Sequence, residues 1–270
     1  MISSGNTINA KTANLKERGD ESSSLKVTPK IDALLENSLS GETLSENDYC
    51  RLIAVEGEEF EALCHAASSI RDKGKGNIIS FSPKIFIPLT KLCRDFCNYC
   101  TFREEPSEGN IFMTPEEILT VVKAGEKLGC TEALFTLGER PEQKYPEASE
   151  WLNKRGYKTT IEYLSDMCKM VTEETKVLPH ANPGTMSSRE MESLQDYNPS
   201  MGLMLESTSK QLYEPGGPHE LAPSKRPTVR LKTIEIAGKL NIAFTTGILT
   251  GIGETLEDRV DSLFAIKKLD

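Results

Sequence analysis

The sequence predicts an α/β fold in which parallel strands form a barrel or an open sheet. Five strand-like apolar runs alternate with segments of helical periodicity, and this order is typical of βαβ units with right-handed crossovers. Unusual polar residues follow the ends of these runs. Because such folds bind ligands at the carboxyl ends of their strands, these residues predict a single site on one rim.

Helical segments are expected before the sheet. Residues 1–28 are rich in Ser, Thr, Asn and Lys and lack apolar periodicity, so we expect a disordered tail. Residues 29–76 are expected to form a helical extension, and residues 77–270 the core. The last helix of the extension has an apolar stripe at steps of three and four residues, formed by Phe60, Leu63, Cys64, Ala67 and Ile70.

Strands and helices of the core can be placed in order along the chain. The strands are predicted at Ile85–Leu89, Ala133–Leu137, Val177–Ala181, Met201–Leu205 and Ile242–Leu249. Four helices are predicted from capping boxes, formed by Thr114 and Glu117, Thr159 and Glu162, Ser187 and Glu190, and Thr255 and Asp258. Another helix is predicted at Thr228–Leu240. The helix after Thr114 is expected to bury Ile118, Val121, Val122 and Leu128.

Three cysteines follow the first strand. Cys93, Cys97 and Cys100 are separated by three and then two residues, which is a spacing typical of metal ligands. Thiolates suit iron and sulfide, so three of them can hold three irons of a [4Fe-4S] cluster and leave the fourth iron open. Structural zinc sites usually close with four ligands, and the sequence has no second CxxC and no HxxxH. A zinc knuckle or three buried structural thiols remain as alternatives.

Together with its flanks, the Cys93–Cys100 segment resembles the signature of the radical S-adenosylmethionine (SAM) enzymes. The resemblance implies that SAM chelates the open iron, and that reduction of the cluster cleaves SAM to methionine and a 5'-deoxyadenosyl radical. It also implies a partial TIM-type barrel of six βα units. Because only five units are recognised, the core is expected to be truncated after the fifth.

A closer resemblance extends from about residue 79 to residue 270. Its motifs are Ile79–Thr90, Cys93–Phe102, Phe135–Glu142, Leu178–Gly184, Ser200–Thr208 and Phe244–Glu254. They are similar to those of the first subunit of deazaflavin (FO) synthase, 7,8-didemethyl-8-hydroxy-5-deazariboflavin synthase. The likeness implies a lyase that cyclises a small molecule, the tyrosine-derived hydroxybenzyl-diaminouracil adduct, to FO with loss of ammonia. It also implies a second FO synthase subunit, as pathway or fusion partner, and a reductant for the cluster.

The resemblance implies roles for individual residues. The cluster ligands are Cys93, Cys97 and Cys100. The residues expected at SAM are Tyr99, Phe102, Gly138, Glu139, Glu206, Arg230, Leu249 and Gly251. The polar groups expected to face the substrate are Arg140, Asn182, Ser207, Thr208, Thr245 and Thr246. His180, taken as the only histidine near this site, is the candidate for proton transfer, and a histidine that only satisfies a hydrogen bond is the alternative.

Composition excludes several other classes of function. A formal charge of −9 argues against a broad phosphate-binding face, so no nucleic-acid partner is expected. No apolar run is long enough for a transmembrane helix, so no membrane partner is expected. Seven cysteines without a signal peptide indicate a reducing compartment, and we expect the cytoplasm. The glycine run that ends at Glu254 lacks the Lys-Ser/Thr of a nucleoside triphosphate loop.

Two other functions remain open. One is another small-molecule radical SAM cyclase, either of the menaquinone-precursor type or the tyrosine-cleaving partner subunit of FO synthase. The other is a metal-binding fragment without catalysis. Product analysis with each substrate would separate the enzymes, and bound zinc without SAM cleavage would indicate the fragment.

Overall fold

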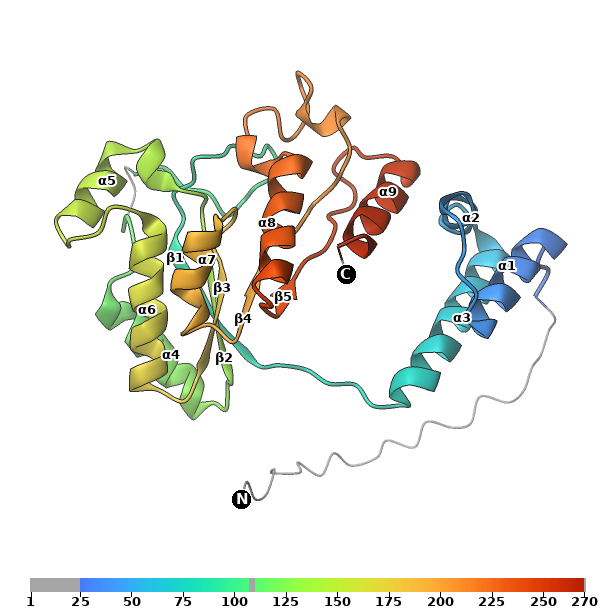
Figure 1. The fold of residues 1–270 in the computed structure, drawn as a ribbon, viewed down its shortest axis with the longest axis horizontal. Coiled ribbons are helices and arrows are strands. Elements are labelled where there is room, and N and C mark those ends of the chain that lie inside the picture. Colours follow the sequence, from blue (N-terminus) through green and yellow to red (C-terminus); the bar gives the residue numbers. More distant parts are fainter. Residues whose placement is uncertain (1–24, 107–109, 270) are drawn as a thin grey trace. The chain divides into compact units, whose positions relative to one another are not determined.

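The computed structural model describes residues 25–106 and 110–269 (Figure 1). The described chain divides into two compact units. The helical unit comprises residues 25–44 and 55–76, and the sheet unit comprises residues 45–54 and 77–269. Most of the tail predicted for residues 1–28 lies outside the described residues.

The helical unit pairs helix α1 (Pro29–Ser40) with helix α3 (Gly57–Lys75). Pro29 begins α1, where the first backbone N–H groups have no partner within the helix, so the missing N–H of proline loses no hydrogen bond. The Thr28 hydroxyl donates to the Glu59 carboxylate of α3 over 2.7 Å. The periodicity of Phe60 to Ile70 correctly predicts the helix, although Ala66 is the buried residue of α3 and Phe60 and Ile70 are exposed. Periodicity identified the helix, whereas the contact with α1 determines which face is buried.

The sheet unit contains five strands that are parallel, as the sequence predicts, and they lie in the order β1-β2-β3-β4-β5 (Figure 1). The strands are β1 (Lys84–Thr90), β2 (Glu132–Leu137), β3 (Leu178–Asn182), β4 (Ser200–Gly202) and β5 (Phe244–Thr245). The last two are shorter than predicted. After β4 and β5 end, the Leu205 N–H donates to the hydroxyl of Thr246 instead of to a backbone carbonyl. Among the described residues, the two segments then form a parallel bridge between Glu206 and Ile248.

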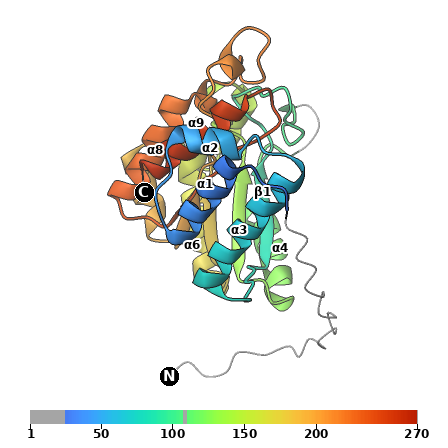
Figure 2. The same ribbon diagram turned by 90° about the vertical axis from the view of Figure 1, so that its right-hand side faces the viewer.

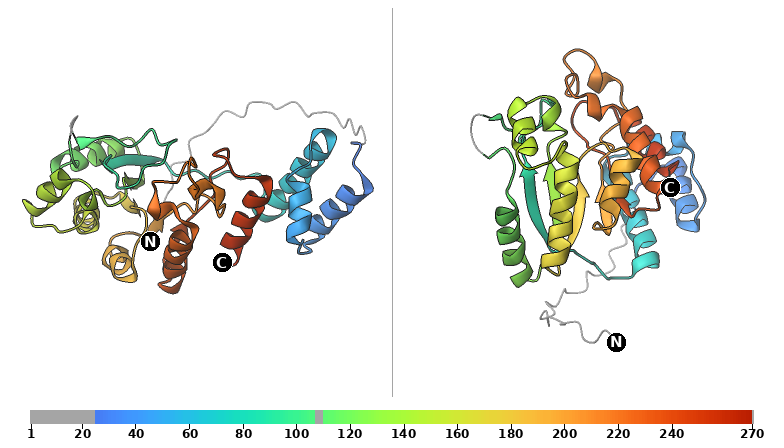
Figure 3. Two further views of the ribbon diagram at one scale, coloured as in Figure 1. Left: turned by 90° about the horizontal axis from the view of Figure 1, so that it is seen from above. Right: turned by 60° about the vertical axis from the view of Figure 1, so that its left-hand side comes forward.

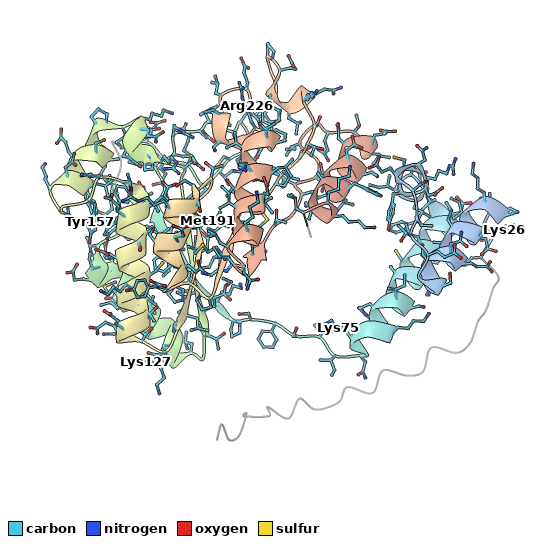
Figure 4. All side chains as sticks on the ribbon, viewed as in Figure 1. Lys26, Lys75, Lys127, Tyr157, Met191 and Arg226 are labelled. Atoms are coloured by element: carbon cyan, nitrogen blue, oxygen red, sulfur yellow. The ribbon has the colours of Figure 1, made fainter. Side chains whose placement is uncertain are left out.

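Helices cover the outer side of the curved sheet (Figures 1 and 3). They are α4 (Pro115–Lys127), α6 (Thr160–Glu174), α7 (Ser188–Gln195), α8 (Pro227–Lys239) and α9 (Leu256–Lys267). All four predicted capping boxes form, and Pro115 and Pro227 begin α4 and α8. Figure 4 marks the two rims of the unit, with Arg226 before α8 at the rim where the strands end and Lys127 at the opposite rim.

Two helices of the sheet unit were not predicted separately. Helix α5 (Pro146–Asn153) lies between β2 and α6, and it has no capping side chain from which the sequence could predict its start. Helix α2 (Glu46–Leu52) lies inside the expected helical extension but contacts α9 (Figure 2). The rings of Tyr49 and Phe264 are 5.3 Å apart, edge to face. No helix of the described chain is long and apolar enough to cross a membrane.

The main core lies between the sheet and its helices. Alternate residues of β1 face the helices, so Ile87 and Leu89 are fully buried against the same core as Ile118 and Val122 of α4. The prediction is wrong for Val121 and Leu128 of this stripe, since these side chains are 40% and 85% exposed. Leu128 is the C-cap residue of α4. The opposite face of the strands lines the inner side of this partial barrel.

Candidate active site

A cavity of about 200 Å³ opens at the carboxyl ends of the strands. Many of the residues predicted for cluster and SAM line it, namely Cys93, Cys97, Cys100, Tyr99, Phe102, Gly138, Glu139, Glu206 and Arg230. From the predicted substrate set, Asn182 lines it. Its other polar lining residues were not predicted, and they include Asp95, Thr136, Ser224 and Lys225.

The cysteine loop lies directly against the end of β2. The Gly138 N–H donates to the Thr90 carbonyl over 3.0 Å, and the Glu139 N–H donates to the Cys93 sulfur over 3.2 Å. A Cβ on Gly138 would lie 2.0 Å from the Leu92 carbonyl oxygen. Only glycine therefore allows β2 to approach this loop so closely.

The segment between β4 and α8 holds the other side of the cysteine loop. Two backbone bonds join them, from Phe96 to Leu221 over 2.9 Å and from Asn98 to Pro218 over 3.1 Å. Next to these bonds, the Tyr99 hydroxyl and His219 Nε2 are 2.7 Å apart. This segment therefore fixes the conformation of the loop that carries the cysteines.

His219 corrects the expectation that His180 is the only histidine near the site. Its side chain is fully buried, and burial, together with the charge of Lys225, lowers the pKa of His219 to about 4. The imidazole is therefore neutral at pH 7. No local spacing pattern marks His219, which lies more than a hundred residues after its partner Tyr99.

The three cysteines suit a cluster better than a single ion. Burial raises the pKa of the Cys97 thiol to about 11, and the charges of Cys93 and Cys100 act in the same direction. Such thiols ionise when they bind metal. In residues 25–106 and 110–269, no three His, Cys, Asp or Glu side chains are grouped to hold one metal ion. A four-iron cluster has no such requirement, because each cysteine binds a different iron.

A buried carboxylate beside the cysteines is only half satisfied. The Asp95 side chain is 2% exposed, and one of its oxygens accepts a hydrogen bond from the Ser224 hydroxyl. The other oxygen is buried and has no hydrogen-bond donor in the described part of the chain. Arg94 Nε lies 3.7 Å from this oxygen, so an ion pair with Arg94 stabilises the charge of Asp95 beside the cavity.

One carboxylate and two cations face the cavity near the end of β4. Glu206, whose φ of +70° is in the left-handed region, pairs with Lys225, and Arg230 Nη1 lies 3.7 Å from the same Glu206 oxygen. Arg230 is 4% exposed and also donates to the carbonyls of Ser224 and Met204. A ligand with both hydroxyl groups and a carboxylate matches this charge pattern.

Leu249 and Gly251 do not line this cavity, and their role at SAM stays a prediction. The Leu249 N–H donates to the Glu206 carbonyl over 2.8 Å and so supports the strained Glu206 backbone. The Gly251 N–H donates to Glu254 over 2.7 Å. Although burial opposes it, this bond and the ion pair with Arg259 hold the pKa of Glu254 at about 2. Both residues thus shape the turn after β5.

Arg140 is also placed elsewhere than predicted. Its φ is +38°, and its guanidinium forms a bidentate pair with Glu190 of α7, at 2.9 and 3.0 Å. This pair and the Ser187 cap hold the pKa of Glu190 at about 2, although burial alone would raise it. Next to Arg140, the buried Glu139 carboxylate accepts from the N–H and hydroxyl of Thr185. Both side chains therefore hold the loop after β3.

Four predicted substrate residues lie outside the cavity: Ser207, Thr208, Thr245 and Thr246. Ser207 accepts from the Ser209 N–H, and Thr208 bonds to Ser262 of α9. Proximity to a strand end does not specify the face on which a side chain lies, so a substrate role for these four residues stays a prediction. His180 does not line the cavity either; it lies on β3, two residues before Asn182.

A family model described as the radical SAM superfamily matches residues 87–266. FO synthase of Streptomyces avermitilis is 44% identical over 246 residues, covering 87% of this chain and 29% of that protein. The 7,8-didemethyl-8-hydroxy-5-deazariboflavin synthase of Methanopyrus kandleri is 52% identical over 193 residues, covering 71% of this chain and 58% of that protein. The chain thus spans less than two thirds of the length of either relative.

Solved structures of similar fold include methylornithine synthase (PylB), with a TM-score of 0.69 and 22% identity over 88% of this chain and 65% of that one. The FeFe-hydrogenase maturase HydG from Carboxydothermus hydrogenoformans has a TM-score of 0.69 and 23% identity over 87% of this chain and 52% of that one. At these identities the likeness concerns the fold, and it agrees with the partial TIM-type barrel expected from the sequence.

Proposed function

Because the chain belongs to the radical SAM superfamily, we propose that it is the ring-closing part of an FO synthase. Its substrate is the tyrosine-derived hydroxybenzyl-diaminouracil adduct, and its product is 7,8-didemethyl-8-hydroxy-5-deazariboflavin, formed with loss of ammonia. When bound, a [4Fe-4S] cluster and SAM supply the 5'-deoxyadenosyl radical that takes a hydrogen atom from this adduct.

Each part of the cavity has a role in this proposal. Cys93, Cys97 and Cys100 hold the cluster, and the Glu139 N–H bonds to the Cys93 sulfur. Glu206 accepts hydrogen bonds from the ribose hydroxyls of SAM.

The charged and aromatic residues hold the rest of SAM. Arg230 and Lys225 bind its carboxylate, since both cations lie beside Glu206 at the cavity wall. Tyr99 and Phe102 also line the cavity, and their rings would hold the adenine of SAM and shield it from water.

The observation that carries the proposal is the shared cavity. Three cysteines with cluster spacing line it together with a carboxylate and two cations, although these groups come from the loop after β1, the end of β4, and α8 with the residues before it. The 52% identity to the Methanopyrus kandleri protein supports the choice of deazaflavin substrate within the superfamily.

A second activity must supply the substrate. We propose that it resides on the second subunit of FO synthase, as a separate protein or as a fused domain, and that a reductant delivers the electron for the cluster. The Streptomyces avermitilis FO synthase is several times longer than the matched region, which is compatible with such a fusion.

The test is anaerobic reconstitution with iron and sulfide, followed by incubation with dithionite, SAM and the adduct. We expect 5'-deoxyadenosine together with a fluorescent deazaflavin. Cys97→Ala is expected to abolish both products, whereas the matched control Cys64→Ala, which removes an exposed thiol of α3, is expected to retain both.

Two other outcomes would overturn the assignment. Formation of 5'-deoxyadenosine without deazaflavin would indicate another radical SAM cyclase, and the same incubation with tyrosine and the diaminouracil would then test the partner activity. A colourless chain that binds zinc and cleaves no SAM would indicate a metal-binding fragment without catalysis.

A further inference from the structure

A second polar cluster lies on the inner side of the barrel, closer to the start of the strands. His180 and Asn182 face the same side of β3, because side chains two residues apart share a face. Asn182 lines the cavity, and His180 lies about 7 Å further along the strand, one layer deeper. In the parallel register, Leu134 of β2 and Ser200 of β4 are the neighbours of His180.

One ring nitrogen of His180 is held by its neighbours. Nδ1 is 2.7 Å from the Ser200 hydroxyl and 3.7 Å from the Glu132 carboxylate of β2. The same Glu132 oxygen forms an ion pair with Lys84 of β1. A carboxylate beside Nδ1 favours the tautomer with hydrogen on Nδ1, which leaves the lone pair on Nε2.

The other ring nitrogen faces the inner side of β4. A Cβ added to Gly202 would lie 3.0 Å from His180 Nε2, so the glycine leaves room for this edge of the ring. Among the described residues, the hydrogen bond found for this ring is made by Nδ1, and none is found for Nε2. The Glu132 carboxylate and the Ser200 hydroxyl thus orient the ring through Nδ1, and Nε2 keeps a lone pair that can accept a proton.

We propose that His180 is the proton acceptor when ammonia leaves the cyclised adduct, and that Glu132 is its positioning residue. This inference rests on the proposed function. Nε2 removes a proton from the carbon next to the one that carries the ammonium group. The C–H electron pair becomes a C=C bond, the C–N pair leaves with ammonia, and neutral His180 becomes an imidazolium. Atoms and charge balance without an oxidant.

The charges around His180 suit a base. Burial lowers the pKa of His180, the charge of Lys84 lowers it further, and Glu132 acts in the opposite direction. The imidazole is therefore neutral at pH 7, as a proton acceptor must be. The adduct joins a hydroxybenzyl group to a uracil with a ribityl chain, so it is long enough to extend from the layer of Asn182 to that of His180.

The test compares His180→Gln with the wild-type chain and with His65→Gln, a control that changes an exposed histidine of α3. We expect His180→Gln to cleave SAM with the adduct while FO formation falls at least about 100-fold, and His65→Gln to match the wild type. In Glu132→Gln, the acid limb of the pH–rate profile should move to lower pH, because the carboxylate that raises the pKa of His180 is gone.

A measurement without substrate completes the test. Nitrogen-15 NMR of the imidazoles in the full chain should show the His180 signals of an unprotonated Nε2, with the signals identified by their loss in His180→Gln. FO formation by His180→Gln at the wild-type rate, or hydrogen on Nε2, would overturn the inference. Failure of the proposed function has a different signature, since the wild-type chain itself would then form no FO.

Discussion

The contact between Gly138 and the cysteine loop can be tested with a single methyl group. In Gly138→Ala, the new Cβ would start 2.0 Å from the Leu92 carbonyl oxygen, 2.6 Å from its carbon and 2.8 Å from the Cys93 Cβ. Packed heavy atoms stay about 3.5 Å apart, so the loop must move by roughly 1.5 Å. Two of these atoms belong to the backbone, and no rotamer change can relieve the clash.

The free-energy cost follows from what this movement disturbs. Overpacking costs about 1–3 kcal/mol, and loss of the bond from Gly138 to Thr90 would add about 1 kcal/mol. We therefore expect the free energy of unfolding of Gly138→Ala to fall by about 2–4 kcal/mol. The loop that moves carries Cys93, so we also expect less iron to bind during reconstitution.

The assay pairs denaturant unfolding with the iron content after anaerobic reconstitution. Gly238→Ala is the matched control, because Gly238 lies exposed in α8 and its added Cβ meets nothing within 4 Å. It should gain up to about 1 kcal/mol of stability and bind iron like the wild type. If Gly138→Ala unfolds and binds iron like the wild type, the close approach of β2 to the loop does not constrain this site.

Three further substitutions test neighbouring contacts. Glu254→Gln should lower the free energy of unfolding by about 1–3 kcal/mol at pH 7. Because the pKa of Glu254 is depressed to about 2, the difference in stability between wild type and variant should shrink as pH falls from 4.5 towards 2. Denaturant unfolding at a series of pH values measures this difference. Tyr99→Phe leaves the buried Nε2 of His219 unpaired and should cost about 1–3 kcal/mol in the same assay. Glu206→Gln should weaken SAM binding to the reconstituted chain about tenfold, measured by equilibrium dialysis, and unchanged binding would remove the ribose role.

Local chemistry made much of the fold predictable. The capping boxes at Thr114 and Thr159 depend on residues three positions apart, and both form as predicted. The parallel order of the strands followed from their alternation with helices. The spacing of the cysteines likewise predicted their shared loop, because a tight turn leaves few alternatives. These features depend on short separations along the chain, so the sequence contains the information directly.

What only the tertiary structure decided is which side chains meet. Lys225 lines the cavity and His219 bonds to Tyr99, which also lines it. Both come from the segment between β4 and α8, and nothing in their local sequence marks them. Arg140 follows β2 as predicted, yet it pairs with Glu190 of α7 because the left-handed backbone turns its guanidinium away from the cavity. Such contacts join residues tens to more than a hundred positions apart. The alternation of side chains along a strand shows which residues share a face, but it does not show which face lies towards the cavity. Packing of the strands against the helices determines that.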